Sequence, residues 1–324
     1  FISGLTHYIN NKLFMIQGQE ISLNVTIGVA GSNHNPNAER KRDIMAHSDM
    51  ALKLAKKTRK DYLFYDESLH IKEDYENNLS WIKRLRNAID ENRVVPFYQP
   101  IVNAQTLKTE KYEALVRIVE KDGTIISPFQ FLEISKKVKL YPQITRIMIT
   151  KVLEALPHHP GIQCSINLSI EDITDSFMNA YIIDKIKDCL YADRIIFEIL
   201  ESEGIENYET INRFITEVKK YGVKIAIDDF GAGYSNFVYI TKLDIDYIKI
   251  DGSIIRTIDS NSTSQIITKT IIDFASQLNI ETVAEFVCDE NVYNYVKQLP
   301  LNHFQGYYFA EPSPTMNDAT QTRS

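Results

Sequence analysis

The segment VKIAIDD, residues 223–229, is a short apolar run that ends in two aspartates. Seven other short apolar runs, of five to seven residues, recur along the chain, and helical patterns follow most of them: VVPFYQ (94–99), YEALVRI (112–118), QCSIN (163–167), RIIFEI (194–199), DYIKID (246–251), ETVAE (281–285) and FQGYYF (304–309). The later runs are mostly roughly 20 to 35 residues apart, a spacing typical of alternating strands and helices. Eight such strands in roughly 220 residues predict an α/β fold, a (β/α)8 TIM-type barrel with a parallel sheet. No GxGxxG follows the first strand, which disfavours a dinucleotide-binding fold.

Polar side chains lie in or at the end of these runs, where a strand buried on both faces should be apolar. They are Gln99, Glu113 with Arg117, Asn167, Glu198, Asp228 with Asp229, Lys249 with Asp251, Glu285 and Gln305. Taken singly, each is typical of a strand rim, a turn or a loop cap. Because the carboxyl ends of barrel strands meet at one mouth, their repetition on strand after strand predicts a shared site.

Five of these side chains are carboxylates, which repel one another at close range: Glu113, Glu198, Asp228, Asp229 and Glu285. Two unit charges 4 Å apart repel by about 4 kcal/mol at an effective dielectric near 20. Lys249 and Arg117 cannot balance five carboxylates, whereas divalent cations can. Oxygen ligands suit Mg²⁺ or Mn²⁺ and not zinc, and adjacent aspartates suggest two ions sharing one carboxylate. The pattern therefore predicts hydrolysis of a phosphodiester with two metal ions per site.

The ordered set of motifs resembles the EAL domain, the bacterial phosphodiesterase of cyclic di-GMP. The signature is Glu113-Ala114-Leu115, and the match extends over YQPI (98–101), INLS (166–169), FEI (197–199), DDFGAGYS (228–235), IKIDGS (248–253), VAE (283–285) and QGYYFAEP (305–312). It covers about residues 76–313. The resemblance implies a modified (β/α)8 barrel that hydrolyses cyclic di-GMP to linear pGpG with Mg²⁺ or Mn²⁺.

The resemblance also implies a role for each site residue. The metal ligands are Glu113, Asn167, Glu198 and Asp228 for the first ion, and Asp228 and Asp229 for the second. The substrate-binding residues are Gln99, Arg117, Asp251 and Gln305, with Arg117 on a phosphate. The catalytic set is Lys249, which orients or deprotonates the attacking water, Glu285, which with Gln305 helps to position metals and water, and Glu201, which braces the loop 230–236. That loop contributes to dimerisation in the family, so a homodimer through the barrel is expected.

Two departures from the family pattern keep a second interpretation open. Leu200 stands where the family usually has threonine, and Phe286-Val287-Cys288 follows Glu285 where the family usually has Gly-Val-Glu. The alternative is an EAL-type receptor that binds cyclic di-GMP without turnover. A barrel that serves only dimerisation, and a phosphodiesterase of another substrate, are two further alternatives.

The N-terminal residues predict a smaller α+β element, with a strand over 21–30, a helix over 38–59 and a strand over 61–65. ISLNVTIGVA (21–30) and SDMALKLAKKTRKDYLFYD (48–66) resemble the C-terminal part of a GGDEF domain, without its signature motif. The expected organisation is a GGDEF-like part over 1–70, a linker helix over 71–93, the barrel over 94–315 and a tail over 316–324. An upstream GGDEF and sensor region is expected in the full-length protein.

Composition restricts the partners of this chain. Its 324 residues carry a formal charge of −7, which gives no general basic field for duplex nucleic acid. No apolar run reaches the roughly 18 residues that a membrane span requires, so no membrane contact is expected here, although a full-length parent could be membrane-anchored. The three cysteines are scattered, which favours a reducing, cytoplasmic setting. The start at Phe1 suggests a fragment.

Overall fold

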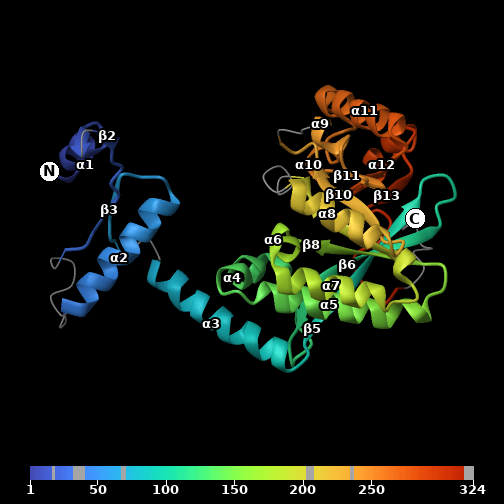
Figure 1. Ribbon diagram of the computed structural model, residues 1–324, viewed down its shortest axis with the longest axis horizontal. Helices are drawn as coiled ribbons and strands as arrows, with labels where there is room; N and C mark the ends of the chain where they lie inside the picture. The colour runs from blue at the N-terminus through green and yellow to red at the C-terminus, as the bar shows by residue number, and fades with distance from the viewer. Residues whose placement is uncertain (17–18, 32–40, 67–70, 202–207, 234–236, 317–324) are drawn as a thin grey trace. The chain divides into compact units, whose positions relative to one another are not determined.

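The computed structural model describes residues 1–16, 19–31, 41–66, 71–201, 208–233 and 237–316 (Figure 1). The chain divides into two compact units, Phe1–Arg84 and Leu85–Ser324, and each is described by itself. The division falls within helix α3 (Ile71–Asp90), whose Leu85 and Ala88 are fully buried in the second unit. Among the described residues, no helix combines the length and apolarity needed to cross a membrane.

The described residues of the first unit form two small sheets and two helices, in addition to the first part of α3. Strands β1 (Leu13–Ile16) and β2 (Gln19–Ser22) pair antiparallel, and β3 (Ile27–Val29) and β4 (Tyr62–Phe64) pair parallel; the helices are α1 (Ile2–Asn10) and α2 (Lys41–Lys57). The single strand predicted over 21–30 is wrong, because this segment is divided between β2 and β3. Between them, the Val25 amide donates to the Asn10 side chain at 2.7 Å, so the backbone there pairs with the end of α1 and not with a strand.

The second unit is built on a closed ring of eight strands, as predicted. The strands are β5 (Val94–Asn103), β6 (Thr109–Val119), β8 (Gln163–Leu168), β9 (Ile195–Leu200), β10 (Lys224–Phe230), β11 (Tyr247–Ile250), β12 (Glu281–Ala284) and β13 (His303–Gln305). Their order is β5-β13-β12-β11-β10-β9-β8-β6, and pairing of β5 with β6 closes the ring. The short strand β7 (Ile125–Ile126) adds to the outer end of β6. The fold is an α/β barrel of the TIM type.

Two details of the barrel differ from the prediction. Strand β5 runs antiparallel to both β6 and β13, because β5 and β6 form a hairpin with no crossover helix between them. The last predicted strand, 304–309, is a strand only over His303–Gln305. Beyond it, the Val287 carbonyl accepts from the Tyr308 amide at 3.0 Å and the chain turns, so no ladder continues.

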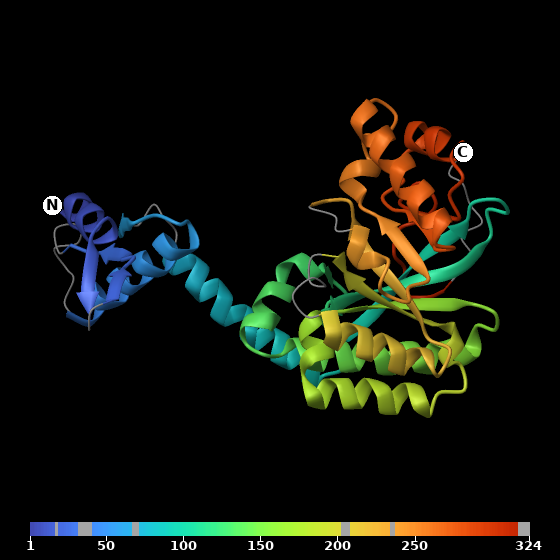
Figure 2. The ribbon, with the colours of Figure 1, turned by 45° about the horizontal axis from the view of Figure 1, so that its top comes forward.

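Helices cover the outside of the ring of strands in both views (Figures 1 and 2). They are α4 (Leu132–Lys137), α5 (Tyr141–Ala155), α6 (Ile170–Thr174), α7 (Ser176–Lys187), α8 (Tyr208–Lys219), α9 (Phe237–Ile240), α10 (Gly252–Ile255), α11 (Ser262–Gln277) and α12 (Glu290–Val296), with 3₁₀ turns η3 (Pro128–Gln130), η4 (Leu156–His158) and η5 (Ala192–Arg194). The strands between them are largely buried, and β11 is buried at every residue. The polar side chains inside the ring therefore need partners of their own.

Candidate active site

Lys249 lies at the centre of a group of four carboxylates. Its Nζ is 2.8 Å from Glu198 Oε2, 2.8 Å from Glu285 Oε1, 3.1 Å from Asp228 Oδ1 and 3.4 Å from Glu113 Oε2. Lys249 is only 1% exposed, and all four acids are buried. These residues come from β6, β9, β10, β11 and the end of β12, so the barrel brings together side chains that are 172 residues apart at most, from Glu113 to Glu285.

Three side-chain amides complete the ring of polar groups. Asn167 Nδ2 donates to Glu113 Oε1 at 2.8 Å, and Gln305 Nε2 donates to Glu113 Oε2 at 2.6 Å. Gln305 Nε2 is also 3.3 Å from Gln99 Oε1, and Gln99 donates to the Ala310 carbonyl. Each of the eight barrel strands thus supplies a polar residue at this mouth. Among the described residues, the buried Gln305 Oε1 has no hydrogen-bond partner, which leaves an acceptor available to a ligand.

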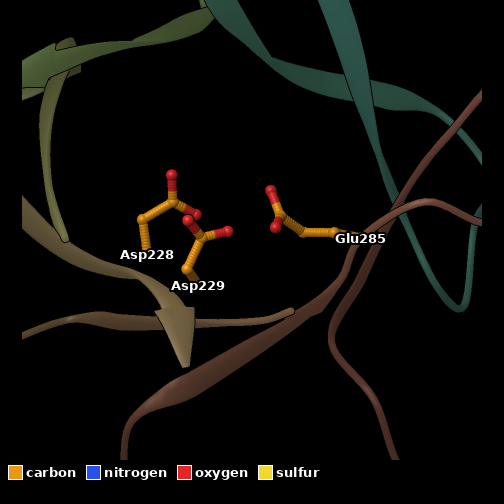
Figure 3. A group of neighbouring side chains, drawn as sticks. All are labelled: Asp228, Asp229 and Glu285. Carbon is orange, nitrogen blue, oxygen red and sulfur yellow. The ribbon is translucent and has the colours of Figure 1, made fainter. Parts of the chain in front are cut away.

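Asp229 shares the mouth with Asp228, although alternation along a strand would place its side chain on the opposite face. The backbone at Asp229 has a φ of 55°, a left-handed conformation that aspartate tolerates better than most residues. The β10–β11 register shifts at the same place, between Ile227 and Phe230. As a result Asp228, Asp229 and Glu285 point toward one another, with one oxygen from each within 4.8 Å of the others (Figure 3).

Burial and mutual repulsion make most of these carboxylates weaker acids. Burial, followed by the charge of Glu113, raises the pKa of Glu198 to about 8. Burial and the charge of Asp228 raise the pKa of Asp229 to about 6, and the same causes raise the pKa of Glu285. Glu113 is the exception: burial acts to raise its pKa, but Lys249, Gln305 and Asn167 together hold it below the usual value.

Lys249 is held as an ammonium group in this environment. Burial alone lowers the pKa of Lys249, but the four carboxylates around it outweigh burial and raise the pKa well above its usual value. One ammonium among four carboxylates still leaves an excess of negative charge. The carboxylate atoms around Lys249 that could bind a metal are all oxygens, the ligand atoms that hard divalent cations such as Mg²⁺ and Mn²⁺ prefer. The residues present therefore fit such an ion.

The thermal stability of the protein without divalent cations is expected to fall as pH rises from about 5 to about 8. The pKa of Glu198 is 4.5 when unperturbed and about 8 in the fold, so the folded state binds more protons than the unfolded state in this interval. The contribution of Glu198 to stability is fully present below pH 4.5 and is lost as the pH rises through about 8. The measurement is the Tm in EDTA across this pH range.

Glu198→Gln is the matched control for this pH dependence, because the amide keeps the shape of the side chain and cannot titrate. The slope of Tm against pH should become shallower in this variant. A Tm that rises with pH between 5 and 8 in the wild-type protein would contradict the described electrostatics.

The remaining predicted residues lie at the edge of the mouth. Glu201 Oε2 accepts from the Gly231 amide at 3.2 Å, within the described part of the loop 230–236; residues 234–236 lie outside the described residues. The Asp251 carboxylate accepts from the Ser253 amide at 2.8 Å, and its proximity adds to burial and Asp228 in raising the pKa of Asp229. Arg117 donates to the neighbouring Val116 carbonyl and lies 5.9 Å from the Phe97 ring centroid, so it borders the carboxylates without pairing with them in this arrangement.

Phe286, one of the departures from the family pattern, turns onto the backbone of α10. A Cβ added at Gly252 would overlap the Phe286 ring, so the ring rests directly on that glycine. The Arg256 guanidinium carbon lies 4.1 Å from the ring centroid on a half-exposed face. Phe286 has a φ of 50°, which is unfavourable for a bulky residue, so packing against Gly252 and Arg256 must offset backbone strain.

A cavity of about 500 Å³ adjoins the carboxylate group. Glu113, Asn167 and Asp229 line both the cavity and the mouth, and Leu200, the other departure, lies in its wall. The rest of the wall is mostly apolar and includes Phe129, Leu132, Tyr141, Met148 and Ile166. The sequence does not predict the part of the cavity wall that η3, α4 and α5 contribute, because the residues of these elements belong to no motif with a fixed spacing. The one available signal was Phe129, an aromatic residue beside Pro128 in a turn.

A model of the family described as "EAL domain" matches residues 82–312. Cyclic di-GMP phosphodiesterase PdeB of Shewanella oneidensis is 32% identical over 260 residues, covering 76% of this chain and 30% of the relative. The bifunctional diguanylate cyclase/cyclic di-GMP phosphodiesterase MucR of Pseudomonas aeruginosa is 26% identical over 312 residues, covering 93% of this chain and 44% of the relative. The chain thus spans about a third to under a half of these relatives.

Solved structures give the same match. The PaMucR phosphodiesterase in complex with c-di-GMP superposes with a TM-score of 0.69 at 26% identity, over 73% of this chain and 98% of that one. An EAL domain protein from Listeria monocytogenes superposes with a TM-score of 0.65 at 28% identity, over 70% of this chain and 92% of that one. Each match is about as long as the barrel unit, Leu85–Ser324.

Proposed function

The chain belongs to the EAL domain family, and on this premise we propose that it is a phosphodiesterase that hydrolyses cyclic di-GMP to linear pGpG in bacterial second-messenger signalling. The observation that carries the proposal is the group of four carboxylates around Lys249, which adjoins a cavity. Relatives that bear the name cyclic di-GMP phosphodiesterase, and a structural neighbour in complex with c-di-GMP, support the choice of substrate.

The acidic residues are proposed to hold two divalent cations, Mg²⁺ or Mn²⁺. Glu113, Asn167, Glu198 and Asp228 would hold one ion, and Asp228 and Asp229 the other, with Glu285 beside them. Bound ions of this kind lower the pKa of a water molecule and offset negative charge on a phosphate. The excess of carboxylates over ammonium groups supports this assignment, since these residues cannot all be charged without further cations.

The chain's own side chains are proposed to position the reacting groups. Lys249 holds its proton among the carboxylates, which suits it to orient the attacking water and to stabilise charge on the phosphate oxygens. Asn167 and Gln305 fix the Glu113 carboxylate through hydrogen bonds of 2.8 and 2.6 Å. In the reaction, the water oxygen bonds to phosphorus, the bond from phosphorus to the ribose 3′ oxygen breaks, and a proton ends on that oxygen.

The outer residues are proposed to bind the substrate and to brace the site. Gln99, Gln305 and Asp251 line the substrate side of the mouth, and Arg117 would pair with a phosphate once one is bound. Glu201 supports the backbone after the aspartates through its bond to the Gly231 amide. The cavity is proposed to take one guanine base of the substrate, because its walls are mostly apolar and it opens beside the carboxylates.

The proposed domain organisation is the one that the sequence predicts. Residues 1–70 would be the C-terminal part of a GGDEF domain, 71–93 a linker helix, 94–315 the phosphodiesterase and 316–324 a tail, of which 317–324 lie outside the described residues. The match of the bifunctional relative MucR over 93% of the chain supports a GGDEF-containing parent. A homodimer through the barrel is part of the same proposal.

Incubation of the purified chain with cyclic di-GMP and Mg²⁺ or Mn²⁺, followed by nucleotide chromatography, tests the proposal. Linear pGpG should form, and EDTA should prevent its formation. Unchanged cyclic di-GMP together with binding in calorimetry would favour the receptor alternative, for which Leu200, Phe286 and Cys288 are the first residues to examine. The absence of both turnover and binding would overturn the proposal and favour a scaffold.

A further inference from the structure

We propose that Phe129 and Lys136 select the purine base of the substrate: Phe129 stacks on its face, and Lys136 donates to its O6 and N7 acceptors. Both residues line the cavity that adjoins the carboxylate group. The inference rests on the proposed function and adds to it the residues that set base specificity.

Phe129 presents an open aromatic face at the cavity. It is 95% exposed even though it lines the cavity, whereas Phe131, two residues later, is fully buried. The 3₁₀ turn η3 begins at Pro128, whose ring fixes its own φ, and the buried Phe131 anchors the other end of the turn. The backbone of the turn is thus fixed, and the exposed Phe129 ring is open to a planar base. Base stacking on such a side chain contributes about 1–3 kcal/mol and does not depend on which base is bound.

Lys136 supplies the positive charge that the cavity otherwise lacks. Glu113, Glu133 and Asp229 line the cavity, and Lys136 is the one cationic side chain among the described residues that do so. It lies in the last turn of α4, and its Nζ is 5.1 Å from the ring centroid of Tyr141, another lining residue. A contact with the Tyr141 ring keeps the ammonium group beside the cavity.

A lysine at this position distinguishes guanine from adenine. Guanine presents two acceptors, O6 and N7, along one edge, and an ammonium group donates to both. Adenine carries an amino group at the same place as O6, so a lysine meets a donor there and gains less. Stacking on Phe129 should therefore favour either base, while Lys136 should favour guanine alone.

The test measures by calorimetry the Kd values of two ligands, cyclic di-GMP and cyclic di-AMP. Ca²⁺ is present in place of Mg²⁺ or Mn²⁺, because it also prefers oxygen ligands. Phe129→Leu keeps an apolar side chain and removes the aromatic face. It should raise the Kd of both ligands by about tenfold. Lys136→Met keeps the length of the side chain and removes the charge. It should raise the Kd of cyclic di-GMP by about tenfold and change that of cyclic di-AMP less than twofold.

Two substitutions on α7 are matched controls. Phe177 is an exposed phenylalanine, and Lys185 Nζ lies 5.8 Å from the Tyr181 ring centroid, so each resembles its counterpart without lining the cavity. Phe177→Leu and Lys185→Met should leave both Kd values unchanged. Because the substituted side chains are on the surface, an unchanged Tm should accompany every variant.

The possible outcomes separate this inference from the proposed function. Wild-type protein that binds cyclic di-GMP, with Phe129→Leu and Lys136→Met binding equally well, overturns the inference and leaves the function standing. A Lys136→Met variant that loses both ligands equally overturns base selection, since the lysine would then act on phosphate. Wild-type protein that neither binds nor cleaves cyclic di-GMP overturns the proposed function and the inference with it.

Discussion

Glu113→Gln is expected to lower kcat for cyclic di-GMP by about a thousandfold while the barrel remains folded. The Glu113 carboxylate meets Lys249, Asn167 and Gln305, and it lines the cavity as well as the mouth. Glutamine keeps this shape but removes the negative charge that a divalent cation requires. A thousandfold loss corresponds to about 4 kcal/mol of transition-state stabilisation, a reasonable contribution for one charged ligand of a catalytic metal.

Glu110→Gln is the control for this substitution. Glu110 lies near the start of the same strand, β6, where it accepts from Asn103 Nδ2 at 3.2 Å, at the end of the barrel opposite to the mouth. Its kcat should equal that of the wild type. Circular dichroism and Tm of both variants establish that they fold, and undiminished hydrolysis by Glu113→Gln would remove Glu113 from the proposed site.

Lys249→Met is expected to reduce turnover far more than binding of cyclic di-GMP. The ammonium group is proposed to orient the attacking water and to meet charge that develops on the phosphate, so its removal affects the transition state more than the bound substrate. We expect kcat to fall by about a hundredfold to a thousandfold, while the Kd in Ca²⁺ changes less than tenfold. Equal losses in the two quantities would show that Lys249 acts in binding.

The same substitution should also weaken the fold when divalent cations are absent. Lys249 is the partner of four buried carboxylates, and removing one member of a buried ion pair typically costs about 3–5 kcal/mol. The loss should be smaller at pH 5, where Glu198, with a pKa of about 8, is protonated, and Mg²⁺ or Mn²⁺ should restore part of it. Chemical denaturation in EDTA, with and without added cation, measures both effects.

Lys111→Met is a matched control for Lys249→Met, because Lys111 is another buried lysine of the barrel. It lies at the opposite end, with Nζ 2.9 Å from His303 Nε2 and 3.9 Å from Glu281. Its replacement should cost stability without a change in kcat. Addition of Mg²⁺ or Mn²⁺ should not recover that stability, since among the described residues Glu281 is the one carboxylate in an ion pair with Lys111.

The barrel could be predicted from the sequence because its strands repeat as short apolar runs with polar ends. The direction of β5 could not be predicted, since a run such as VVPFYQ can form either a parallel or an antiparallel strand. The single strand predicted over 21–30 failed for a similar reason, because only the folded chain shows the Asn10 side chain pairing with the Val25 amide.

The candidate site was predictable to the extent that polar residues interrupt or close apolar runs. Glu113 and Glu198 lie within such runs, whereas Asp228 and Glu285 lie at or near the end of theirs. The barrel places all four around Lys249. The inward direction of Asp229 depends on a left-handed backbone that no sequence period indicates. The cavity escaped prediction because Phe129 and Lys136 lie in a turn and a short helix that approach the strands only in the folded protein.

Hydrolysis of cyclic di-GMP in ¹⁸O-labelled water, analysed by mass spectrometry, tests the central claim most directly. If the carboxylate group and Lys249 direct water onto phosphorus, the product is linear pGpG with one ¹⁸O atom in its terminal 5′-phosphate, and EDTA abolishes it. Linear product without the label in its phosphate would contradict attack of water at phosphorus. Intact cyclic di-GMP in the presence of Mg²⁺ or Mn²⁺ would contradict the assignment of this barrel as an enzyme.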